Sequence, residues 1–200
     1  MNSFVSVKIL SVLIIANVLL NAQTKTNLDV FKVLVDSSIA DLLINAPGSQ
    51  KNIYVDLKLG SSYTIFENQI YKSVQTRKMS ISPVFNPSEN SKVSYSIENS
   101  AVNYGEVFRD GFFGDHFVER KIVISGSCWF QNEEMIVKDF SFENMDTVKF
   151  DDIQTLENSS YPFTKGNIPT EPFLSNLFEP IVAITTAAVV IALFFTVRSK

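Results

Sequence analysis

The apolar positions of the first half of the chain follow two different spacings. Over 27–44 they recur every three or four residues, which predicts an amphipathic helix with one buried face. Over 53–59 apolar and polar residues alternate, which predicts a strand with one buried face. Gly60 follows this alternation and is expected to end the strand.

A second helix is predicted over 62–76. Phe66, Ile70 and Val74 lie four positions apart, so they share one face of a helix. Ser62 precedes them and can cap the first turn with its hydroxyl group. The chain therefore begins its folded part with a helix, a strand and another helix.

Strands dominate the chain after this second helix. The face of the longest alternating segment that carries Ile122 and Ile124 also carries Arg120 and Cys128. The predicted fold class is α+β, with two N-terminal helices packed on a mixed, largely antiparallel sheet, plus a C-terminal transmembrane helix. The alternating segments that predict strands are 79–82, 93–97, 102–107, 118–130 and 135–143.

The N-terminal segment 1–22 has the pattern of a secretory signal peptide. Lys8 precedes an apolar run, and the small residue Ala22 stands where cleavage is expected. An uncleaved anchor is the alternative. Either reading directs the following domain out of the cytoplasm.

A second apolar segment, Ile181 to Val197, contains no charged residue. At 1.5 Å per residue it gives a helix of about 25 Å, near the lower limit for a bilayer span. The basic residues in 198–200 are expected to stay in the cytoplasm. The sequence thus predicts an exported domain over 24–157, a proline-containing stalk over 158–180 and a single transmembrane helix. A sorting signal processed after export is the alternative.

Composition narrows the set of partners. The chain has 17 Lys and Arg against 21 Asp and Glu, a net charge of −4, and no basic stripe. Nucleic acid is therefore not predicted as a partner. One cysteine allows no internal disulfide, which favours a bacterial envelope protein over a small extracellular module of the animal type.

The order helix, strand, helix, strand and then several antiparallel strands resembles the small periplasmic α/β domains of bacterial envelope lipoproteins. Such domains activate penicillin-binding proteins or assist secretion and surface assembly. The resemblance is one of topology over about 120 residues, and fold alone does not transfer function. It implies an accessory domain of the cell envelope.

The segment FRDGFFGDHF contains most of the candidate chemistry. His116 is the only histidine. Asp110 or Asp115 could orient it as a base, with Cys128 or one of the serines as nucleophile. The chain has no G-x-S-x-G pattern, and Cys128 stands in mid-strand, where a buried and inert thiol is expected. The possible metal ligands match neither a calcium-loop nor a zinc spacing, so no metal and no cofactor are predicted; they are Asp110, Asp115, His116 and Glu119.

The same segment is dense in aromatic side chains. Phe108, Phe112, Phe113 and Phe117 lie within ten residues, beside Arg109. The rings either fold inward against the sheet or form a surface that meets a partner. These five residues are the candidate partner-binding residues.

Taken together, the sequence predicts a non-catalytic binding or scaffolding domain on the outer, periplasmic side of a bacterial membrane. Its predicted partners are membrane-proximal envelope proteins and, through Ile181 to Val197, the membrane itself. No small-molecule ligand is indicated. The alternative is an envelope hydrolase that uses the loop 106–119, with His116 as base.

Overall fold

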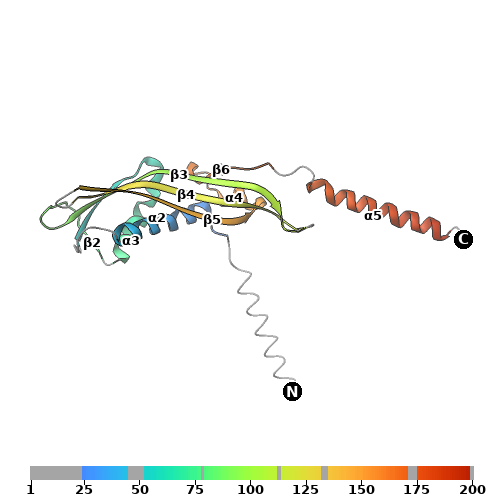
Figure 1. Ribbon diagram of the computed structural model, residues 1–200, viewed down its shortest axis with the longest axis horizontal. Helices are drawn as coiled ribbons and strands as arrows, with labels where there is room; N and C mark the ends of the chain where they lie inside the picture. Colours follow the sequence, from blue (N-terminus) through green and yellow to red (C-terminus); the bar gives the residue numbers. More distant parts are fainter. Residues whose placement is uncertain are drawn as a thin grey trace, which may run out of the picture.

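The computed structural model describes residues 24–44, 52–77, 79–111, 114–131, 135–170 and 175–198, with the side chains of the last range described over 180–196. The predicted signal peptide 1–22 lies outside the described residues. Within them, the strands form one sheet in the order β2-β1-β3-β4-β5, and β6 also pairs with β3. Figure 1 shows β3, β4 and β5 running side by side over much of the length of the domain.

The helical predictions hold in their positions. Helix α2 spans Asn27–Ile44, and strand β1 spans Asn52–Lys58. The second predicted helix begins as a 3-10 turn, η1, over Ser61–Phe66 and continues as α3 over Glu67–Thr76. Because β1 separates α2 from α3 along the chain, the helices are not a consecutive N-terminal pair.

The sheet is mixed, as predicted. Strand β1 runs parallel to both β2 and β3, whereas β3, β4 and β5 are antiparallel. The strands predicted at 93–97 and 102–107 form one continuous strand, because a β-bulge between Ile97 and Asn99 absorbs the irregular position between them. The strand bounds are β2 Ser80–Ile81, β3 Ser91–Arg109, β4 His116–Gln131, β5 Met135–Lys149 and β6 Gly166–Asn167.

Helices α2 and α3 cover one face of the sheet. Alternate residues of β4 point into this core, among them Ile122, Ile124 and Cys128. The opposite face, here called the open face, carries the other alternate positions, such as Ser94 on β3 and Trp129 on β4. An antiparallel sheet with one face solvated is common, and the alternation in the sequence predicts it.

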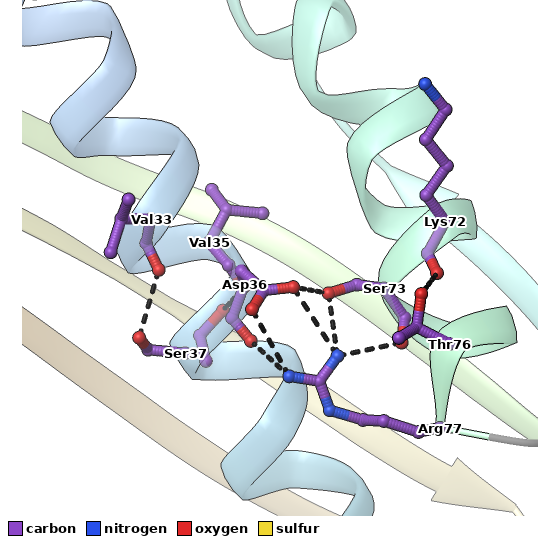
Figure 2. Close-up of polar contacts among 9 residues, drawn as sticks. Val33, Val35, Asp36, Ser37, Lys72, Ser73, Thr76 and Arg77 are labelled. Carbon is purple, nitrogen blue, oxygen red and sulfur yellow. Dashed lines mark hydrogen bonds and ion pairs between the residues drawn. The ribbon is translucent and has the colours of Figure 1, made fainter.

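A polar network fixes α2 to α3 on the covered side. The Ser73 hydroxyl group donates to Asp36, and Arg77 donates from Nη2 to Asp36 Oδ2 at 3.3 Å and from Nη1 to the Ser73 carbonyl at 2.8 Å (Figure 2). These contacts join two helices that are distant in sequence. Their role is structural, because they hold α2 and α3 together.

The segment after β5 packs back on the domain. Helix α4 spans Ile153–Leu156, and the 3-10 turn η3 spans Pro162–Thr164. The Phe163 ring lies 5.3 Å from the Phe31 ring and 5.5 Å from the Phe66 ring, measured between centroids. The first part of the segment predicted as a stalk therefore belongs to the packed domain.

Helix α5 spans Ser175–Arg198 and lies apart from the sheet (Figure 1). Within the described residues, none of the helices combines the length and the apolar composition that a membrane crossing requires. The prediction of a transmembrane helix at Ile181 to Val197 is therefore not supported.

Candidate functional site

The segment FRDGFFGDHF joins β3 to β4 at one end of the sheet and is called the hairpin end below. Arg109 is the last residue of β3 and pairs with His116, the first residue of β4. The Asp110 amide donates to the Asp115 carbonyl at 3.2 Å, and Gly111 has a φ of 72°. A positive φ is accessible to glycine without strain, so this residue allows the turn. The structure places Asp110 and Asp115 between the two strands, whereas His116 belongs to β4 itself.

Two of the four phenylalanines can be placed. Phe108 and Phe117 face each other across β3 and β4, with ring centroids 6.2 Å apart and planes inclined by 29°. Phe108 is 45% exposed, and neither ring belongs to the buried core. Phe112 and Phe113 lie outside the described residues. The described pair forms an aromatic surface at the edge of the molecule.

The charged groups of the hairpin end make contacts within the domain. Arg109 donates from Nε to the Gly114 carbonyl at 2.9 Å. Asp115 forms an ion pair with Lys149 at the end of β5. The hydrogen bond from Lys149 lowers the pKa of the Asp115 carboxyl group, and the positive charge of Lys149 lowers it further. Asp115 is thus an ion-pair partner for Lys149.

Cys128 does not contribute a nucleophile to His116. They lie twelve positions apart on the same strand, which corresponds to about 40 Å at 3.3 Å per residue. The Cys128 thiol is buried, donates to the Lys138 carbonyl at 3.2 Å and has a pKa raised by that burial. In the part of the chain that the structure describes, no three His, Cys, Asp or Glu side chains are grouped as metal ligands.

A second region, on the open face, was not predicted from the sequence. It is a hollow of about 210 Å³ near the C-terminal end of β4, which is the end away from the hairpin end. We call it the Trp129 hollow. Its lining residues are Asp56, Lys58, Lys92, Ser94, Trp129, Gln131 and Met135.

Strand register explains the shape of the Trp129 hollow. Asp56 on β1 pairs with Ser94 on β3, and Ser94 pairs with Trp129 on β4. All three side chains therefore point to the same face in one row across the sheet. The small Ser94 side chain lies between two larger ones, so it forms the floor and they form opposite walls.

The charged wall holds one carboxylate and two ammonium groups. Asp56 lies 2.9 Å from Lys92 Nζ and 3.3 Å from Lys58 Nζ. The hydrogen bond from Lys92 lowers the pKa of the Asp56 carboxyl group, with a smaller contribution from Lys58. Among the described residues that line the hollow, two lysines therefore stand against one carboxylate, an excess of one positive charge.

Comparisons with known proteins give a limited result. No protein family and no curated protein matches this sequence. A minor lipoprotein from Acinetobacter baumannii is similar in structure with a TM-score of 0.34 at 8% identity, over 52% of this chain and 70% of that one. Rare lipoprotein B from Shewanella oneidensis gives a TM-score of 0.33 at 8% identity, over 48% and 68%.

A third solved structure is described as a putative neuraminyllactose-binding hemagglutinin homolog from Helicobacter pylori. Its TM-score is 0.31 at 12% identity, over 54% of this chain and 69% of that one. Two of these three structures are bacterial lipoproteins. TM-scores in this range do not establish a shared fold.

Proposed function

We propose that this chain is a non-catalytic binding or scaffolding component of a bacterial cell envelope, and that it binds membrane-proximal proteins through the hairpin end. The observation that carries the proposal is the partly exposed aromatic pair at the end of the two longest strands. Phe108 is 45% exposed and stacks on Phe117. Exposed aromatic surface is typical of interaction sites, and its removal from water favours binding.

The polar groups around this pair favour binding over catalysis. Asp115 is held by Lys149, and the Arg109 guanidinium group is directed at the turn backbone. The alternative hydrolase would need His116 beside a nucleophile, and Cys128 is about 40 Å away along β4. We therefore retain the hydrolase only as an outcome of the test.

The test is a crosslinking pull-down from membranes with three variants of the full chain. Phe108→Ala is expected to reduce recovery of crosslinked partners several-fold, because it removes exposed aromatic area. Met145→Ala, which removes another exposed apolar side chain on β5, serves as the matched control and should retain them. Equal recovery with Phe108→Ala and Met145→Ala would contradict the proposed surface.

His116→Ala tests the alternative. Under the binding proposal, the variant keeps both its partners and its cellular function. Loss of function in a folded His116→Ala protein that still recovers its partners would instead favour the hydrolase.

We also propose that α5 associates with the membrane and holds the domain on its outer side. The support is the exposure of large apolar side chains along the helix, among them Ile184 at 69% and Phe195 at 67%. Such surface is costly in water and favourable in contact with lipid. We expect the full chain to sediment with membranes in physiological salt. Its recovery in the soluble fraction would refute the association.

A further inference from the structure

The Trp129 hollow has the features of a binding site that is separate from the hairpin end. It lies near the opposite end of β4, roughly 40 Å from His116 at 3.3 Å per residue. Its volume of about 210 Å³ is below the roughly 300–1,000 Å³ of pockets for drug-sized ligands, so it suits a single ring. Its floor is Ser94, whose small side chain leaves space between the walls.

One wall is aromatic. Trp129 is the only tryptophan in the chain and is half-buried on the open face. An indole face carries negative charge density and attracts the positively polarised C–H groups of a sugar ring. Among the residues that the structure describes, none accepts a hydrogen bond from the indole N–H, so this donor is available to a ligand.

The facing wall is cationic overall. Lys58 and Lys92 both contact Asp56, and each ammonium group has three N–H donors. One carboxylate neutralises only one of the two charges. A ligand that brings a second carboxylate would balance the wall and accept hydrogen bonds from the remaining donors.

We propose that the Trp129 hollow binds an acidic sugar, namely a pyranose ring that bears a carboxylate, as a unit of an acidic glycan. The apolar face of the ring packs on Trp129. Its carboxylate meets Lys92 and Lys58, and its hydroxyl groups exchange hydrogen bonds with Ser94 and Gln131 at the rim. The size of the hollow, the aromatic wall and the excess positive charge each select one part of this ligand.

The single tryptophan makes the test direct. Purified full chain is titrated with D-glucuronate, D-glucose or acetate while Trp129 emission is recorded. Glucuronate is expected to change the emission with saturation at a Kd of about 1 mM, the range that ligand efficiency allows for about a dozen heavy atoms. Glucose lacks the charge and acetate lacks the ring, so each is expected to bind at least tenfold more weakly. No saturation with glucuronate, or equal affinity for acetate, overturns the proposal.

Two variants test the charged wall by calorimetry. Lys92→Gln is expected to weaken glucuronate binding about tenfold, because it removes one charged hydrogen-bond donor. The matched control is Lys121→Gln on β4, on the same face of the sheet. Lys121 pairs with Glu143 outside the hollow, so this change should leave the affinity unchanged. Equal affinities in the two variants would argue against the assigned site.

Asp56→Asn provides an independent and opposite readout. It frees both lysines from their internal carboxylate, so glucuronate should bind several-fold more tightly, whereas simple damage to the hollow would weaken binding. Weaker binding in a folded Asp56→Asn protein overturns the proposal. Because the hairpin end is untouched, recovery of protein partners in these variants distinguishes this inference from the proposed protein-binding surface.

Discussion

Arg120 is the largest side chain that is completely buried among the described residues, and its charge has one carboxylate partner. It donates from Nε to Asp146 Oδ1 at 2.8 Å and from Nη2 to Asp146 Oδ2. Its Nη1 donates to the Lys25 carbonyl at 2.9 Å and to Asn27 Oδ1 at 2.7 Å. The guanidinium group therefore ties β4 to β5 and to the start of α2.

Asp146→Ala should destabilise the domain strongly, because it leaves the Arg120 charge buried with two of these bonds lost. Breaking a buried ion pair from one side costs about 3–5 kcal/mol. The Asp146 side chain is 36% exposed, so water can replace part of the interaction. We expect a loss of about 2–3 kcal/mol in the free energy of unfolding. At about 2–4 °C per kcal/mol for a chain of this size, Tm should fall by about 4–12 °C.

The assay is urea unfolding followed by Trp129 fluorescence and far-UV circular dichroism. Glu143→Ala is the matched control on the same strand, because its pair with Lys121 lies at the surface with both side chains about half exposed. That change should cost less than about 1 kcal/mol. If Asp146→Ala cost no more than Glu143→Ala, the buried guanidinium group would not depend on its carboxylate, and the reasoning would be refuted.

Two further predictions concern packing and pH. A Cβ atom at Gly126 would lie 2.0 Å from the Ser96 carbonyl oxygen, so Gly126→Ala should lower the free energy of unfolding in urea by about 2–3 kcal/mol. Gly60→Ala is the control, because a Cβ atom there would have nothing within 4 Å. It should change the free energy of unfolding by less than about 0.5 kcal/mol. Similar midpoints for both would contradict the close approach. The hydrogen bond from Lys92 lowers the pKa of Asp56 in the folded state. The ion pair therefore stabilises the fold fully above about pH 3.9, the pKa of an unfolded aspartate, and this contribution is lost as the pH falls through the pKa of folded Asp56. The difference in stability between wild type and Asp56→Asn should therefore narrow in acid, and a difference that stays constant would count against this ion pair.

Much of the fold was predictable because local spacing carries the signal. The alternation over 118–130 predicted β4 and its buried face, and the three- and four-residue spacing predicted α2 with its bounds. The break predicted near Asn99 was wrong, because a β-bulge lets β3 continue across it. A bulge is set by pairing with β4, which local periodicity does not record.

The sequence predicted one of the two candidate sites and not the other. The hairpin end was predicted from its dense aromatics and turn glycines, which are contiguous in the chain. The Trp129 hollow was missed because Asp56, Ser94 and Trp129 come from three strands, and only their register places them in one row. The alternation along each strand tells which face of the sheet a residue lies on. It does not tell which residue of the neighbouring strand lies beside it.

The sequence by itself determined the α+β class, the element order and the covered face of the sheet. Burial of one face makes apolar residues recur every three or four positions in a helix and every second position in a strand, and this spacing can be read within each segment. The sequence also marked Arg120 as a charge on a buried face. Only the tertiary structure decided that Asp146 and Asn27 receive that charge and that Phe163 returns to the core. It also decided that Asp56, with its two lysine partners, faces Trp129 across Ser94. These contacts depend on strand register and on chain return, which bring together residues whose spacing in sequence has no period.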